Sequence, residues 1–404
     1  MKRKQTTGPP EILSPELKRK PTAAAAHAPN FSSLPKHLVD GILFKLPARS
    51  LFRFRLLSRY HLNLIQSPDF IGAHARDSCL NRAGLLVLAD SQSGRAASFL
   101  PPEIQGKTKD GVLISNFSFP FPFLEGYGGG ESLFSYAGSF NGLVCLIVRR
   151  RGEYWVLWNP ATSHFSFAPP PIFFQEHCIC NLRYRRRPCV VVAGFGYDSE
   201  ADDYKSVRVL CWENAIQVEV LTWAKRYWTK IHDDESFYND IVLTSPGPPS
   251  FPDSPVSTEG RVYWMETSSG MVLSFRLREV NLEWISIPDA ADRAHSPSLP
   301  VNRTICAWKG SLAMLVQHLQ EPLLSVWLYD EGESSWSGLV SIPTHGLPRR
   351  VEAIWGVDVE SLLAIYVDCI ACDSRGCGFK LLPFDVIGRA FEFAPTLLPI
   401  PGCS

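Results

Sequence analysis

The sequence lacks the features that place a chain in or on a membrane. No apolar run approaches the roughly eighteen residues that a bilayer-spanning helix needs, and the first residues, Met-Lys-Arg-Lys-Gln, lack the apolar stretch of a secretory signal. An excess of either charge is also missing, because Lys+Arg and Asp+Glu both total 40. The charge of the whole molecule therefore attracts neither nucleic acid nor an anionic membrane. We expect a protein of the nucleus and/or cytoplasm, with no nucleic acid and no membrane among its partners.

Common catalytic patterns are missing too. The sequence has no Gly-x-x-x-x-Gly-Lys-Ser/Thr phosphate loop, no His-Glu-x-x-His helix and no Gly-x-Ser-x-Gly elbow. Gly126–Gly130 is glycine-rich, but no strand-to-helix pattern surrounds it. We therefore predict no catalytic residue, no cofactor and no enzymatic activity. A catalytic propeller with a polar channel is the alternative, and no nucleophile–base pair or carboxylate cluster supports it.

Cysteine usage indicates free thiols. The chain has 11 cysteines, an odd number spread from Cys79 to Cys403, which is typical of a reducing compartment. Zinc ligation is the alternative for two groups, although neither has the paired repeats of a zinc finger. These groups are His177, Cys178 and Cys180 with Cys189, and Cys369 and Cys372 with Cys377. Buried free cysteines explain them more simply, and we predict no metal site.

The 404 residues are too many for one small core, and the sequence predicts three parts. Residues 1–30 are rich in Pro and Ala and carry Lys2-Arg3-Lys4 and Lys18-Arg19-Lys20, which is typical of a disordered tail. The basic clusters are either a bipartite nuclear address or ordinary solvated charge. Residues 31–78 are predicted to be helical, and residues 79–404 to form an all-β domain.

The helical part begins with an amphipathic pattern. Leu34, Leu38, Ile42 and Leu46 recur every four residues, which predicts one aliphatic helix face. Ser32 or Ser33 is the expected N-cap, and Pro47 is expected to stop the helix. A second helix is predicted over residues 50–57, and a third begins at Ser58 and ends before Pro68.

The order of these residues resembles the F-box, particularly its plant form. The match covers about forty residues, from Leu34-Pro35 through Leu46-Pro47 and Ser50-Leu51 to Ser67-Pro68 and Phe70. The resemblance implies docking to a Skp-type adaptor, and through it to cullin and RING subunits. The implied adaptor-binding residues are Leu34, Pro35, Leu38, Ile42, Leu43, Leu46, Pro47 and Leu51. One departure is His61, which stands where the family usually has tryptophan.

After residue 80 the helical period is replaced by short β-branched and aromatic runs between Gly, Pro, Asn and Asp turns. Aromatic pairs recur at intervals close to the kelch period of about 50 residues. The pairs are Trp158 with Phe165, Trp223 with Trp228, Phe275 with Trp284, Tyr329 with Trp336, and Phe384 with Phe391. This repetition predicts a kelch-like β-propeller of six or seven blades, and an irregular β-sandwich is the alternative.

Several motifs of strands and turns in this region resemble the F-box-associated interaction domain of plant F-box proteins. They are Gly138–Cys145, Leu157–Thr162, Gly194–Asp198 with Asp202–Lys205, and Gly260–Trp264. Asn141-Gly142 is typical of a hairpin turn with positive φ, Asn159-Pro160 starts a turn, and Asp198 and Asp202 are expected to cap loops.

Two arginine clusters are the candidate substrate-binding residues, because guanidinium groups bind carboxylates and phosphates through paired hydrogen bonds. They are Arg149, Arg150 and Arg151, and Arg183, Tyr184, Arg185, Arg186 and Arg187. Solvated loop charge is the alternative interpretation.

Together the two resemblances imply a substrate-recognition subunit of a Skp-cullin-F-box ubiquitin ligase complex, in which the β domain binds the target protein. The rival reading is a scaffold or binding protein that does not assemble a ligase because its third helix diverges at His61.

Overall fold

The computed structural model describes most of the helical and β regions. The described residues are 34–91, 94–100, 115–117, 134–149, 153–171, 189–212, 215–231, 251, 255–266, 270–288, 301–318, 323–343, 351–355, 363–366, 370–373, 379–381 and 387–402. The chain divides into two compact units, residues 1–45 and 46–404. The predicted domain boundaries at 30/31 and 78/79 stay predictions.

The first unit contains one helix, α1 (Lys36–Phe44), within its described residues. It begins after Pro35, whose backbone is extended and whose side chain makes no capping hydrogen bond. Ser32 and Ser33, the expected caps, lie outside the described residues. Proline fits this position because the first N–H groups of a helix have no partner within it.

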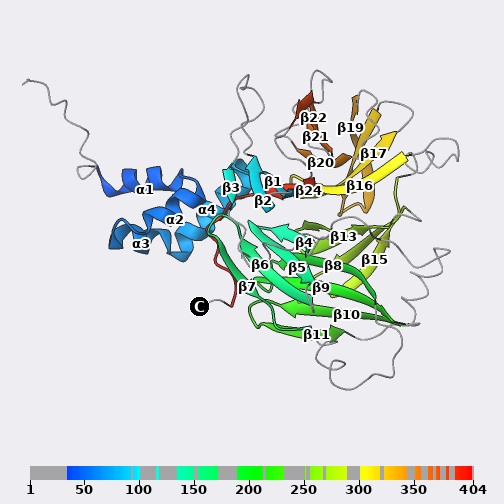
Figure 1. The fold of residues 1–404 in the computed structure, drawn as a ribbon, viewed down its shortest axis with the longest axis horizontal. Coiled ribbons are helices and arrows are strands. Elements are labelled where there is room, and N and C mark those ends of the chain that lie inside the picture. The colour runs from blue at the N-terminus through cyan, green and yellow to red at the C-terminus, as the bar shows by residue number, and fades with distance from the viewer. Residues whose placement is uncertain are drawn as a thin grey trace, which may run out of the picture. The chain divides into compact units, whose positions relative to one another are not determined.

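The second unit begins with three helices, α2 (Ala48–Phe54), α3 (Arg59–Ile65) and α4 (Pro68–Asn81) (Figure 1). Serine side chains cap two of them, because Ser58 accepts from the His61 N–H and Ser67 from the Phe70 N–H. The third predicted segment does end before Pro68, but this proline also occupies the first turn of α4. The sequence did not predict α4 as a separate helix.

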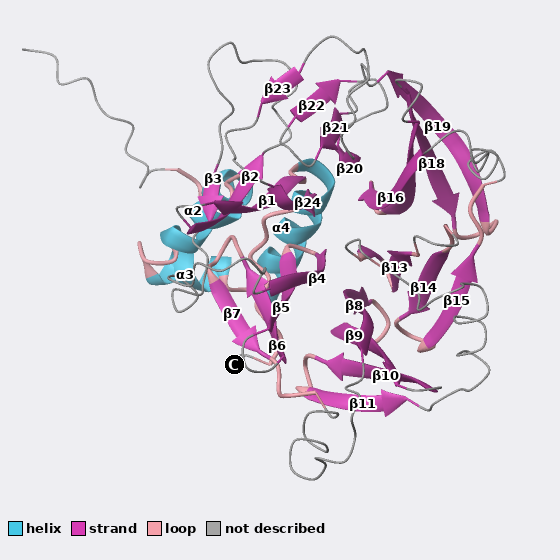
Figure 2. Ribbon diagram, turned by 45° about the vertical axis from the view of Figure 1, so that its right-hand side comes forward, coloured by secondary structure: helices cyan, strands magenta, loops and turns pink. Residues whose placement is uncertain are grey.

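Twenty-four strands follow, in six antiparallel four-stranded sheets among the described residues. Around a ring these sheets follow chain order, which is the arrangement of propeller blades and not of a two-layer sandwich (Figure 2). A helical segment followed by a mostly β region is therefore confirmed. The first sheet consists of β24 (Ile387–Phe393), β1 (Gly84–Ser91), β2 (Gly94–Leu100) and β3 (Ser115–Phe117).

The other sheets each use four consecutive strands. The second sheet contains β4 (Phe134–Phe140), β5 (Leu143–Arg149), β6 (Glu153–Asn159) and β7 (His164–Phe167). The third contains β8 (Cys189–Asp198), β9 (Asp203–Trp212), β10 (Ala215–Thr222) and β11 (Tyr227–Ile231). The fourth sheet contains β12 (Val256–Thr258), β13 (Arg261–Met265), β14 (Val272–Arg276) and β15 (Asn281–Ile285). The fifth contains β16 (Val301–Trp308), β17 (Ser311–His318), β18 (Leu323–Asp330) and β19 (Ser335–Pro343). The sixth contains β20 (Val351–Trp355), β21 (Leu363–Tyr366), β22 (Ile370–Asp373) and β23 (Phe379–Leu381).

Strand β24 ties the end of the β region to its beginning. It pairs with β1 from Gly84↔Phe393 to Ala89↔Ile387, so the last strand in the chain completes the first sheet. Beyond β24, the Asn159 side chain donates to the carbonyls of Thr396 and Leu398, which fixes the C-terminal segment to the second sheet. Strand β1 is therefore paired on both sides, with β2 and with β24.

The hydrophobic core lies between consecutive sheets. Trp158 packs in the cluster shared by the first and second sheets, and Trp223 in the one shared by the second and third. Trp264 belongs to the next cluster, where Gly194 makes room for it: a Cβ on Gly194 would lie 2.6 Å from the Trp264 ring. A sheet with two apolar faces is thus covered on both sides by its neighbours.

The aromatic repeat marks the third and fourth strands of four sheets. Trp158 faces Phe165 across β6 and β7, and Tyr329 faces Trp336 across β18 and β19. The second and third pairs also lie on or beside such strands. The fifth pair departs, because Phe391 is on β24 and Phe384 lies outside the described residues.

The turn predictions are confirmed at Asn141-Gly142, Asn159 and Asp198, but not at Asp202. Asn141 and Gly142 both have positive φ, +50° and +77°. The Asn159 side chain accepts from the N–H groups of Ala161 and Thr162, and Asp198 accepts from those of Glu200 and Ala201. Asp202 differs, since its carboxylate accepts from the Tyr197 hydroxyl.

Within the described part of the chain, no helix has the length and apolarity that crossing a bilayer requires.

Candidate functional site

Helix α1 presents an open aliphatic face. Leu34, Leu38 and Ile42 are 37%, 47% and 50% exposed, although each is a large apolar side chain. Leu43, which follows Ile42, is only 5% exposed. The four-residue spacing of the sequence therefore corresponds to solvent-facing positions, and Leu43 is not one of them.

The remaining predicted adaptor-binding residues differ in burial. Pro35 and Pro47 are exposed, Leu46 is half-buried and Leu51 is fully buried. Pro47 is the N-cap of α2, so the ring that stops α1 also starts the next helix. Leu51 supports the packing of the helices and offers no surface to another protein.

Three exposed apolar side chains were not among the predicted adaptor-binding residues. Leu56 and Leu57 are 88% and 65% exposed, and Tyr60 is 39% exposed. The predicted helix over residues 50–57 includes both leucines, but α2 ends at Phe54. Two consecutive leucines directly after Arg55 were the sequence signal that could have indicated this exposed apolar surface.

His61 lies in the first turn of α3 and is half-buried. Its Nδ1 lies 2.7 Å from the Ser58 hydroxyl oxygen, and its ring contacts Tyr60 edge to face with centroids 5.6 Å apart. The imidazole is thus held against the beginning of its own helix.

The predicted substrate-binding arginines are not brought together by the described structure. Arg150, Arg151 and residues 183–187 lie outside the described residues. The backbone of Arg149 ends β5, where it pairs with Glu153, and its side chain is also outside the description. The assignment of these clusters stays a prediction.

The cysteines that the structure describes are buried or half-buried thiols. Cys145 and Cys306 are buried and Cys79 is half-buried, and all three are free. Across the described ranges, no three His, Cys, Asp or Glu side chains gather to hold a metal ion. The side chains of both candidate zinc groups lie outside those ranges.

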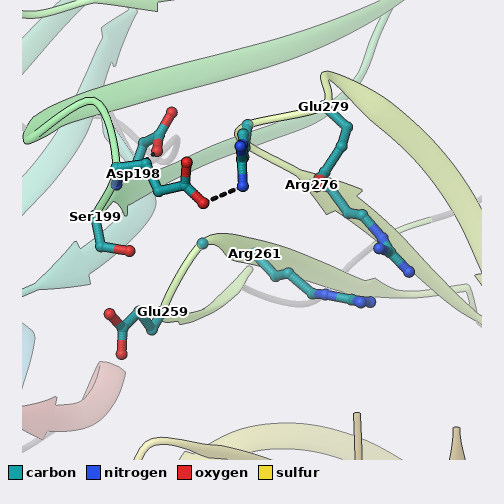
Figure 3. A pocket seen from close by; sticks show the side chains of 9 residues that line it. Asp198, Ser199, Glu259, Arg261, Arg276 and Glu279 are labelled. Carbon is teal, nitrogen blue, oxygen red and sulfur yellow. Dashed lines mark hydrogen bonds and ion pairs between the residues drawn. The ribbon is translucent and has the colours of Figure 1, made fainter. Parts of the chain in front are cut away.

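A charged pocket opens between the third and fourth sheets, with a cavity volume of about 250 Å³. Three turns form it, namely β8–β9, β12–β13 and β14–β15 (Figure 3). We call it the turn pocket, and it is lined by Asp198, Ser199, Glu200, Glu259, Gly260, Arg261, Arg276, Arg278 and Glu279.

Backbone hydrogen bonds hold the three turns together. The Gly260 N–H donates to the Tyr197 carbonyl at 3.1 Å, and the Leu277 N–H donates to the Gly260 carbonyl at 2.9 Å. Lys205 donates to the Asp198 carboxylate at 2.6 Å and to the Leu277 carbonyl at 2.9 Å. The base of the pocket is therefore tied across both sheets.

The Asp198 carboxylate is stabilised as the charged form. Burial tends to raise its pKa, but the hydrogen bond and charge of Lys205 and the N–H groups of Ala201 and Glu200 hold the pKa below its usual value. Asp198 is thus an ionised structural group, and its charge is balanced by Lys205.

Sequence reasoning assigned Asp198 to a loop cap and Gly260–Trp264 to a strand motif, and it gave neither a place in a site. It missed the pocket because its nine residues come from turns that are far apart in the chain. No local motif marks a site assembled in this way.

Comparison with known proteins identifies the β region. Residues 85–352, more than half of the chain, match the family described as the F-box associated beta propeller domain. The F-box/kelch-repeat protein At3g23880 of Arabidopsis thaliana is 25% identical over 343 residues, which cover 80% of this chain and 82% of that protein.

Two further relatives from Arabidopsis thaliana agree. The F-box/LRR-repeat/kelch-repeat protein At1g09650 is 24% identical, with 77% of each chain covered. The F-box protein CPR1 is 29% identical, with 52% of this chain and 48% of that protein covered. The chain belongs to the plant F-box proteins that carry an F-box associated beta propeller domain.

Proposed function

We propose that this protein is the substrate-recognition subunit of a Skp-cullin-F-box ubiquitin ligase complex. The helical segment docks a Skp-type adaptor, and the adaptor connects the chain to cullin and RING subunits. The β region binds the target protein. The chain itself catalyses no step, and it acts in the nucleus and/or the cytoplasm.

The exposed aliphatic face of α1 carries this proposal. Leu34, Leu38 and Ile42 are 37% to 50% exposed on one short helix. Covering an aliphatic side chain with another protein contributes about 1.5–3 kcal/mol when the burial is complete. A partner that covers all three side chains, together with Pro35, gains enough to form a stable interface core.

The contribution to ubiquitin transfer is proximity. A target held beside a charged conjugating enzyme reacts at a raised effective concentration, which removes part of the entropic barrier. This role needs no catalytic group in this chain.

We further propose that the six described sheets are the blades of one kelch-like propeller. The support is the chain-ordered arrangement of four-stranded sheets, the core clusters between neighbours and the pairing of β24 with β1. Such a ring offers its loops and turns as a binding surface.

The adaptor proposal is tested with two substitutions on the exposed face, Leu38→Asp and Ile42→Asp. Each places a carboxylate where a desolvated apolar contact is expected, and each should reduce adaptor co-purification by at least about tenfold. Leu43→Asp is less informative, because Leu43 is buried and its replacement would destabilise the protein itself.

Tyr227→Asp is the matched control. Tyr227 is an exposed apolar residue on β11, at 53% exposure, and its replacement should leave co-purification unchanged. Equal adaptor recovery from the wild type and both helix variants would exclude this face as the docking site.

A scaffold that assembles no ligase is the second candidate. It is favoured by His61, whose half-buried ring is held by Ser58 and Tyr60 where an indole is expected. His61→Trp separates the two candidates. Adaptor affinity that is undetectable in the wild type and appears in His61→Trp would favour the scaffold, and strong binding by the wild type would exclude it.

A further inference from the structure

We propose that the turn pocket binds a lysine or arginine side chain of the target protein. The inference rests on the proposed function, because it names the class of target segment that the β region holds. It follows from the way in which the charges around the pocket are already paired.

Two of the three arginines that line the pocket are bound by carboxylates outside it. Arg261 contacts Glu283 at 2.6 Å and Glu331 at 3.2 Å. Arg276 contacts Glu283 at 3.2 Å. Both side chains extend away from Glu259 (Figure 3). The salt bridges of both guanidinium groups are thus made with carboxylates outside the pocket.

The third arginine is paired within the pocket. Arg278 forms an ion pair with Glu200, and the two side chains are 61% and 59% exposed. An ion pair this exposed contributes at most about 1 kcal/mol, so an incoming cation can exchange for Arg278 at small cost. Glu200 then becomes a further ligand.

Glu259 and Glu279 are the remaining carboxylates of the pocket, and the charge of Glu279 adds to the hydrogen bond and charge of Glu283 in raising the pKa of Arg276. Among the described residues, neither carboxylate forms a salt bridge or a side-chain hydrogen bond. They belong to different turns, β12–β13 and β14–β15. The pocket therefore keeps an acidic excess that a basic side chain would balance, and it has hydrogen-bond acceptors on more than one wall.

Tyr197, beside the pocket, lies in the field of the same carboxylates. Its hydroxyl donates to Asp202 at 2.5 Å, and its ring is stacked on Phe140 with centroids 5.8 Å apart. Burial, the Asp202 hydrogen bond and the charges of Asp202, Glu259 and Asp198 raise the pKa of Tyr197 to about 12. The same negative surroundings that disfavour a phenolate favour a cation.

The size of the pocket fits one side chain. A volume of about 250 Å³ takes a lysine or arginine side chain and adjacent backbone, but not a folded domain. Arginine matches it well, because a guanidinium forms hydrogen bonds with several carboxylates in one plane. An anionic segment would instead be repelled by the negative charges of Glu259 and Glu279.

The test is a selection of random dodecapeptides displayed on phage against the full chain. The wild type, the double variant Glu259→Gln/Glu279→Gln and the control Glu333→Gln are compared. Glu333 is an exposed carboxylate in the β18–β19 turn, outside the pocket. Wild type and control should select peptides that share a Lys or Arg at one position, and the double variant should lose this preference.

A synthetic peptide from the wild-type selection then gives the affinity by fluorescence anisotropy. Replacing its basic residue by Gln, or using the double variant, should each weaken binding about 3- to 30-fold, and the two changes together should weaken it no further. Absence of a basic preference in the wild-type selection, or equal preference in the double variant, overturns the proposal.

Adaptor co-purification, measured on the same three proteins, separates this inference from the proposed function. Retained adaptor binding without basic selectivity would overturn only the pocket. Basic selectivity that depends on Glu259 and Glu279, in a chain that recovers no adaptor, would leave the pocket in place and overturn the ligase role.

Discussion

The Arg208 guanidinium lies 2.7 Å from the Glu219 carboxylate, and both side chains are fully buried. The two residues face each other on β9 and β10. The same guanidinium contacts Glu153 at 3.0 Å, and Glu153 begins β6 in the neighbouring sheet. One buried cation therefore joins the second and third sheets.

Arg208→Ala should destabilise the protein strongly. It leaves Glu219 and Glu153 buried without their cation, which lowers the free energy of unfolding by about 3–5 kcal/mol. Urea unfolding followed by tryptophan fluorescence measures the loss. Arg278→Ala breaks an exposed pair and should cost less than about 1 kcal/mol. Equal losses in the two variants would contradict the buried role of Arg208.

Gly142→Ala should destabilise more than Gly310→Ala. Both glycines have a φ of +77°, so both replacements carry the left-handed backbone cost of about 1–2 kcal/mol. Only at Gly142 would the new Cβ meet atoms at 2.4 Å and 2.5 Å, on Ala394 and Thr396; at Gly310 nothing lies within 4 Å. The difference in melting temperature between the Gly142→Ala and Gly310→Ala variants measures the contact of Gly142 with the C-terminal segment. Equal melting temperatures would show that this contact is dispensable.

His74 should make stability fall on mild acidification. Burial lowers its pKa, Arg82 adds to this, and the Leu46 carbonyl and Asp77 oppose it. In the unfolded chain His74 takes up a proton near pH 6.5, whereas in the folded chain it does so only at lower pH. The contribution of neutral His74 to stability is therefore complete above about pH 6.5 and decreases below it. The free energy of unfolding should fall more between about pH 7.5 and pH 5.5 in the wild type than in His74→Gln. A parallel dependence in the two proteins would contradict this assignment.

The described cysteines should resist alkylation in the folded protein. Burial raises the pKa of Cys145 and Cys306 to about 12 and that of Cys79 to about 11, so the reactive thiolate is scarce at neutral pH. Mass spectrometry after brief iodoacetamide treatment should find these three unmodified, and all three modified in urea. Rapid labelling of Cys145 or Cys306 under native conditions would show that the sheets open locally.

Local patterns in the sequence determined the order of elements and the form of individual turns. The four-residue spacing of Leu34, Leu38 and Ile42 predicts an amphipathic helix, and Asn141-Gly142 predicts a hairpin, because both depend on neighbouring residues alone. The aromatic repeat likewise predicted paired strands at Trp158 and Tyr329.

Burial and the turn pocket were decided only by the tertiary structure. Ile42 and Leu43 are neighbouring aliphatic residues of the same size, yet Ile42 is exposed and Leu43 is buried. The sequence alone does not show this difference, because burial depends on which other parts of the chain pack against each side chain. Arg208 is a charged residue within a strand, and its buried guanidinium is paired with Glu219 on the adjacent strand and with Glu153 in the neighbouring sheet. The acidic excess of the turn pocket arises in the same way, since the partners of its arginines lie on other strands and turns and leave Glu259 and Glu279 unpaired within the described residues.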